Sequence, residues 1–124
     1  MKVRPLVWII SNQHWPRVYL RAELIERGFD AIGYEEISTA LRWLRYPRTP
    51  KPQIIVLELR GQSLTPKELE RLKQLGIPVV ALGGALELNA PLIRGFEWAA
   101  LLKRPFRIGD VVDLIQQLVE KVED

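Results

Sequence analysis

Short apolar runs alternate with amphipathic stretches along the whole chain, and this alternation constrains the fold more than any other feature. Four runs are rich in aliphatic side chains: Leu6–Ile10, Ile54–Leu57, Val79–Leu82 and Ala99–Leu102. Such runs are typical of strands that are buried on both faces of a parallel sheet. A weaker run, Phe29–Tyr34, alternates between apolar and polar residues, which favours an edge strand.

The first interval between these runs has helical periodicity. We predict a helix over Trp15–Arg27, followed by Gly28 as a C-terminal stop. Its apolar residues form two adjacent stripes. Val18, Ala22 and Ile25 lie on one face of this helix, and Leu20 and Leu24 lie beside them.

The later helices have clearer ends. Glu35–Arg45 is periodic and is followed by three prolines, which exclude a helix and form a stiff connector. The sequence Thr65–Glu68 predicts a capping box with proline at the first helical position, and the helix is expected to end at Gly76. A short helix capped by Asn89 is predicted to run to about Arg94, and a long amphipathic helix follows the last strand.

Strand and helix therefore alternate five times. This order predicts an α/β fold in which helices cover both faces of a parallel five-stranded sheet through right-handed crossovers. The chain has 124 residues, of which 48% are apolar and 27% charged. These values are typical of a globular protein and predict a single domain over residues 1–124.

Composition excludes several kinds of site. The absence of cysteine excludes disulfides and thiolate metal sites, and a single histidine, His14, excludes a histidine-rich metal cluster. We find no nucleophile–base pair and expect no enzymatic activity, no metal and no cofactor. No apolar run reaches the roughly 18 residues of a membrane span, and the first residues resemble a strand more than a signal peptide, so we expect a cytoplasmic protein.

Four segments, taken in order and spacing, resemble the receiver domain of bacterial two-component response regulators. They are residues 6–29 (first strand and helix), KPQIIVLEL at 51–59, IPVVALGG at 77–84 and LLKRPF at 101–106. The resemblance implies a flavodoxin-like three-layer (βα)5 sandwich with strand order 2-1-3-4-5. It also implies a cis peptide bond between Arg104 and Pro105.

The phosphorylation residues of that family are replaced here. The family's two acidic Mg²⁺ ligands, its acceptor aspartate, its serine or threonine and its lysine correspond to Ser11, Asn12, Glu58, Gly83 and Arg104. Neutral oxygens are poor sole ligands for Mg²⁺, which usually needs carboxylates. The pattern predicts a degenerate phospho-acceptor pocket, in which Glu58 is either a permanent acidic mimic paired with Arg104 or a partly solvated strand-end residue.

The resemblance implies a stand-alone pseudo-receiver that acts by protein–protein interaction, with a regulatory or kinase-like partner or a second copy of itself. In that family the usual partner face consists of the fourth helix, fifth strand and fifth helix. The corresponding candidates are Trp98, Leu101, Lys103 and Arg107. Trp98 is either an exposed anchor of this face or packed beneath a neighbouring helix. Three polar residues, Ser11, Asn12 and His14, lie where the first strand meets the first helix. Ser11 and Asn12 could cap the helix or contact a small ligand together with Glu58, and His14 is either a polar lid residue or simply solvated.

The most basic stretch of the chain is Arg42, Arg45, Arg48 and Lys51, interleaved with Trp43 and Tyr46. Cations mixed with aromatic residues suit contact with nucleic acid, which makes a nucleic-acid-associated regulatory adaptor the alternative function. We favour the ordinary interpretation of a solvated helix end and stiff loop, in which long basic side chains cover apolar surface.

Overall fold

Five parallel strands form one sheet in the order β2-β1-β3-β4-β5. The computed structural model describes residues 4–123, with side chains through residue 121. Its strands are β1 (Leu6–Ile10), β2 (Asp30–Tyr34), β3 (Ile54–Glu58), β4 (Val79–Gly83) and β5 (Ala100–Lys103). The predicted fold class and strand order are both confirmed.

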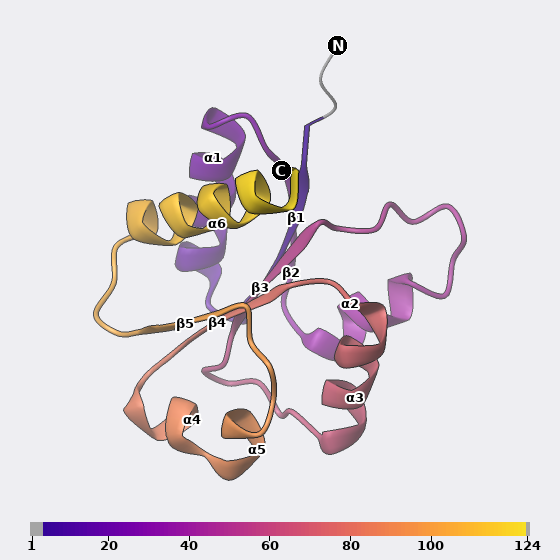
Figure 1. Cartoon of the computed structure of the whole chain (residues 1–124), viewed down its shortest axis with the longest axis vertical. Helices are drawn as coiled ribbons and strands as arrows, with labels where there is room; N and C mark the ends of the chain where they lie inside the picture. Colours follow the sequence, from indigo (N-terminus) through magenta and orange to yellow (C-terminus); the bar gives the residue numbers. More distant parts are fainter. Residues whose placement is uncertain (1–3, 124) are drawn as a thin grey trace.

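Helices cover both faces of the sheet and complete a three-layer sandwich (Figure 1). One face is covered by α1 (His14–Glu26) and α6 (Ile108–Glu123). The other face is covered by α2 (Ile37–Trp43), α3 (Pro66–Leu75), α4 (Ala85–Asn89) and α5 (Pro91–Arg94). Within residues 4–123, no helix combines the length and apolar character that crossing a membrane requires.

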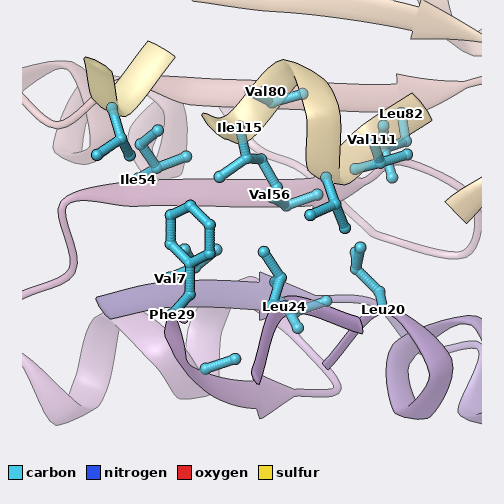
Figure 2. Packing of buried hydrophobic residues seen from close by; sticks show 14 residues of the cluster. Val7, Leu20, Leu24, Phe29, Ile54, Val56, Val80, Leu82, Val111 and Ile115 are labelled. Atoms are coloured by element: carbon cyan, nitrogen blue, oxygen red, sulfur yellow. The ribbon is translucent and has the colours of Figure 1, made fainter. Parts of the chain in front are cut away.

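Side chains of the central strands alternate between the two faces. In β1, Val7 and Ile9 belong to the cluster beneath α1 and α6, whereas Trp8 and Ile10 belong to the cluster beneath α2 and α3. Figure 2 shows the first cluster, in which Leu20 and Leu24 of α1 and Val111 and Ile115 of α6 pack against the same face of the strands. Every residue of β3 and β4 is buried, as the continuous apolar runs predicted.

The periodicity of α1 left open which of its two apolar stripes faces the core. Leu20 and Leu24 are the buried residues of this helix, while Val18 is 39% exposed. Both stripes are apolar, so local periodicity did not decide between them. Packing against α6 and β2 orients the helix so that the leucines meet the core.

The helix ends vary in how well the sequence predicted them. The capping box of α3 is confirmed, because Glu68 N–H donates to Thr65 Oγ1 at 3.2 Å and Thr65 N–H donates to the Glu68 carboxylate at 3.1 Å. The predicted cap at Asn89 is wrong. Asn89 is the last residue of α4, and Ala90 precedes α5, which has Pro91 in its first turn.

Candidate functional site

The residues of the predicted pocket come together at the carboxyl edge of the sheet. Ser11 follows β1, Glu58 ends β3, Gly83 ends β4 and Arg104 follows β5. Because all strands are parallel, their carboxyl ends meet at one edge. The backbone N–H of Arg104 donates to the Gly83 carbonyl at 2.9 Å, which brings the β5–α6 connection against the end of β4. The peptide bond between Arg104 and Pro105 is cis, as predicted.

Arg104 holds two carboxylates from different elements. Its Nη2 forms an ion pair with Glu58, whose side chain is buried although it is charged. Its Nη1 lies 3.3 Å from Oε1 of Glu87 in α4. Glu87 in turn accepts from the backbone N–H of Gly84 at 3.1 Å. One guanidinium thus connects the end of β3 to the first turn of α4, and the ion pair considered in the sequence is present.

Ser11 and Asn12 are engaged in local hydrogen bonds. Ser11 Oγ accepts from Gln13 N–H at 3.1 Å, and the Ser11 carbonyl accepts from Arg17 Nη1 at 2.6 Å. Asn12 Nδ2 donates to the Gly61 carbonyl at 2.9 Å, which connects the β1–α1 and β3–α3 loops. The capping interpretation of these residues is wrong, because Gln13 precedes α1 and makes no side-chain cap bond.

At Gly61 both the backbone conformation and a close contact with Asn12 require glycine. Its φ is +74°, in the left-handed region that favours glycine. A Cβ at this position would lie 2.1 Å from Asn12 Nδ2. The Asn12–Gly61 contact therefore depends on the absence of a side chain at residue 61.

The donor set at this edge does not fit Mg²⁺. Magnesium sites in proteins usually use one or two carboxylates together with water or phosphate. Here Glu58 is the single carboxylate among the five pocket residues, and it is paired with Arg104. Within residues 4–123, no three or more His, Asp or Glu side chains gather in a way that suits a metal ion.

Gly83 stands where the family has a hydroxyl residue, and its surroundings are crowded. A Cβ there would lie 3.3 Å from Leu59 Cδ1 and 3.4 Å from Glu87 Cβ. The first distance requires a small shift of the Leu59 methyl group, and the second is an ordinary van der Waals contact.

The sequence did not identify Glu87 as part of this site. The available signal was its spacing from Gly84, because glutamate at the third helical residue often accepts from the backbone N–H at the helix start. A glycine at the cap position lacks the Ser or Thr that makes this signature recognisable. The contact with Arg104 is between residues 17 positions apart and has no local sequence signal.

The predicted interaction face is exposed only in part. Leu101 is 49% exposed, and Lys103 and Arg107 are exposed as well. Trp98 is instead half-buried: its indole N–H donates to the Ile93 carbonyl at 2.7 Å, and its ring packs against Phe96. Of the two interpretations of Trp98, the structure therefore agrees with packing beneath a neighbouring helix and not with an exposed anchor.

Two leucines that the sequence did not single out extend this face. Leu86 on α4 is 91% exposed and Leu92 on α5 is 37% exposed. With Leu101, Lys103 and Arg107 they make up what we call the α4–β5 face. The periodicity of such short helices carries too little information to show which residues point outward.

The basic stretch lies at the end of α2 and in the loop that follows. Its four cations, Arg42, Arg45, Arg48 and Lys51, are exposed. Trp43 and Tyr46 are 48% and 59% exposed, with ring centroids 5.7 Å apart. The four cations thus lie on a solvated helix end and loop, and about half of each ring surface is open to solvent.

Comparisons with known proteins give matches in structure alone. No protein-family model and no curated protein matches the sequence. A response regulator receiver protein from Pseudomonas putida superposes with a TM-score of 0.77 and 20% identity, covering 94% of this chain and 99% of the other. The chain has the fold of a response-regulator receiver domain.

Two further solved structures of response regulators superpose on this chain over nearly its whole length. The receiver domain of Francisella response regulator 1452 has a TM-score of 0.76 at 18% identity, covering 96% of this chain and 99% of that one. The chemotaxis response regulator CheY4 of Vibrio cholerae has a TM-score of 0.76 at 12% identity, covering 93% and 98%. At such low identity the likeness concerns the fold, and the pocket has to be interpreted from its own residues.

Proposed function

We propose that this chain is a receiver-like signalling module that is not phosphorylated and that acts by contact with another protein. The observation that carries the proposal is the state of Glu58, which stands at the acceptor position. Its side chain is 7% exposed, and its carboxylate is paired with the Arg104 guanidinium. A carboxylate held in this way is shielded from a phosphodonor and has its charge neutralised by the protein itself.

The neighbouring residues support the same proposal. Phosphoryl transfer depends on a metal ion and on positioned cations that neutralise the developing charge. Ser11 and Asn12 carry no charge, and their side chains form hydrogen bonds with the backbone of Gln13 and Gly61. We therefore include neither phosphotransfer nor another enzymatic activity in the proposed function.

The α4–β5 face is the surface that we assign to the partner. Single exposed leucines are ordinary, but here Leu86, Leu92 and Leu101 lie on adjoining elements. Lys103 and Arg107 add positive charge at their border, so the surface suits a partner with apolar and acidic side chains. We propose a regulatory or kinase-like protein, or a second copy of the chain, as this partner, and the cytoplasm as the compartment.

Incubation with a small phosphodonor tests the proposal. With Mg²⁺ and acetyl phosphate, followed by intact-mass spectrometry, we expect the natural chain to keep its mass. The matched control restores the family's residues with Ser11→Asp, Asn12→Asp, Glu58→Asp, Gly83→Thr and Arg104→Lys. We expect this variant to gain one phosphoryl group, since it has a carboxylate pair, an acceptor and a lysine.

The result for the natural chain decides the outcome. A stable acyl phosphate on any of its residues contradicts the proposal. Far-UV circular dichroism of the restored variant shows whether it keeps its fold. A receiver domain that carries the acidic pair and the acceptor aspartate serves as the positive control for the donor.

A second candidate function is contact with single-stranded nucleic acid. It is favoured by the exposure of Trp43 and Tyr46 between cations, because stacked bases need an open ring surface. No Asp or Glu occurs between residues 37 and 57, so the four cations of this stretch have no acidic neighbour in the sequence. We expect weak binding that rests on phosphate contacts and base stacking.

Fluorescence anisotropy with a labelled oligothymidylate tests this candidate. Binding is expected at low salt and should fall with a slope of about 0.7 in log–log form for each phosphate contact. The double variant R45Q/R48Q should lose most of the binding, and Arg94→Gln, which removes an exposed cation from α5, should not. Absence of binding at low salt removes this candidate and leaves the first proposal unaffected.

A further inference from the structure

A groove of about 460 Å³ opens beside the pocket, at the carboxyl edge of the sheet. Its walls come from the first turns of α1, from the residues after β3, and from the β5–α6 connection. The chain passes from β1 through α1 to β2 on one side, while β3 lies on the other side of β1. Open α/β sheets bind ligands where the strand order reverses in this way. The volume is also in the range of small-molecule sites.

One wall of this groove is an aromatic pair that the core does not use. Trp15 and Tyr19 are one turn apart on α1, with ring centroids 5.8 Å apart and an angle of 26° between the rings. They are 62% and 57% exposed. Phe106 of the β5–α6 connection is half-buried and lines the same groove. Exposed rings beside a hollow of this size suit a planar ligand that stacks on them.

The charges along the groove favour an anion. It is lined by two arginines and one carboxylate: Arg60, Arg104 and Glu58. Glu58 is paired with Arg104, whose guanidinium also binds Glu87 outside the groove. Arg60 is exposed and forms no ion pair among the residues that the structure describes. Its guanidinium is available to a phosphate, which it binds well because its donors match phosphate oxygens.

We propose that this groove binds a mononucleotide, with the base stacked on Trp15 and the phosphate bound by Arg60. The ring pair recognises the planar base, and the free guanidinium recognises the charge. Such a ligand gives the module an input signal that requires no covalent modification. The proposal does not depend on the partner surface or on the absence of phosphorylation.

The proposed nucleotide site is tested by titrating the protein with adenosine 5′-monophosphate and measuring binding by calorimetry and by ¹H–¹⁵N NMR. Trp15→Ala is expected to weaken binding about 10- to 100-fold, in keeping with the usual contribution of one base stack. Arg60→Gln should weaken it about 10-fold or more, as expected for a hydrogen bond to a charged group. Both side chains are exposed, so these variants should keep the fold.

Matched ligands and variants separate this site from others. Adenosine lacks the phosphate and ribose 5-phosphate lacks the base, and each should bind at least 10-fold more weakly than the nucleotide. The controls Trp43→Ala and Arg45→Gln alter the basic stretch near α2 and should change affinity less than twofold.

Several results would overturn the proposal. They are no saturable binding of the nucleotide, equal affinity for ribose 5-phosphate, or a loss in Trp43→Ala as large as that in Trp15→Ala. Each of these concerns reversible binding, so none bears on the phosphodonor experiment.

Discussion

Arg104 binds two carboxylates in a geometry that a lysine at the same position could not reproduce. Its planar guanidinium presents several donors in a fixed fork, and two of its nitrogens are used for two carboxylates. A lysine ammonium is a single point charge on a flexible stem and would not hold Glu58 and Glu87 in the same geometry. The replacement of lysine by arginine thus goes together with the acid at residue 58. The pocket has become an internal ion-pair network.

Removing the arginine should therefore be costly. In Arg104→Met, the Glu58 carboxylate stays buried without a cation, which usually costs 3–5 kcal/mol of unfolding free energy. The Arg104 side chain is 27% exposed, so water can approach the pair, and we expect about 3 kcal/mol at neutral pH. Urea denaturation of the variant measures this change.

A double variant provides the control for this prediction. E58Q/R104M removes both charges, and it should recover a large part of the stability lost in the single variant. If Arg104→Met unfolds at the same urea concentration as the natural chain, the ion pair contributes little. The account of residue 104 given above would then be wrong.

The sequence predicted where the pocket residues lie, but it did not predict which residues their side chains contact. Strand ends in a parallel sheet share one edge, so Ser11, Glu58, Gly83 and Arg104 had to meet once the strands were recognised. Which partners they take depends on side chains from distant segments. Gly61, in the segment after β3, and Glu87, on the five-residue helix α4, show this, because their sequences had no regular pattern that predicts these contacts.

Among the elements, the helix ends with side-chain caps were the predictable ones. At α3 a threonine, a proline and a glutamate occupy the expected positions, and the structure reproduces their hydrogen bonds. The region of α4 and α5 has glycine in place of the capping residue, and its two helices have five and four residues. Short helices depend on tertiary packing more than on their own sequence, so local rules placed the cap at the wrong residue.

The orientation of α1 shows a second kind of limit. Its sequence holds more apolar residues than one buried face can take, so some of them must remain outside. The fold buries Leu20 and Leu24 and leaves Trp15 and Tyr19 exposed. A surplus of large apolar residues on one helix was visible in the sequence. Its consequence, an aromatic wall beside the groove, required the structure.

At the scale of the molecule, one sheet carries two separate hydrophobic clusters, and the pocket depends on both. The strands that place Ser11, Glu58 and Gly83 are packed on one face by α1 and α6 and on the other by α2 and α3. Residues of a single strand alternate between the clusters. Loss of packing on one face should therefore weaken the whole sheet, including the edge that holds the pocket.

This shared sheet predicts a single cooperative unfolding transition. Ile115→Ala in the cluster beneath α6 and Leu72→Ala in the cluster beneath α3 each remove a buried side chain, and each should lower the unfolding free energy by about 2–5 kcal/mol. The two losses of unfolding free energy should add in the double variant, because the residues belong to different clusters.

Urea denaturation monitored by two signals tests the cooperativity. Far-UV and near-UV circular dichroism should give coincident curves, since the buried Trp8 reports tertiary packing and the backbone signal reports the helices. Curves that separate in Ile115→Ala would mean that the two faces unfold independently, and that the pocket edge is held by only one of them.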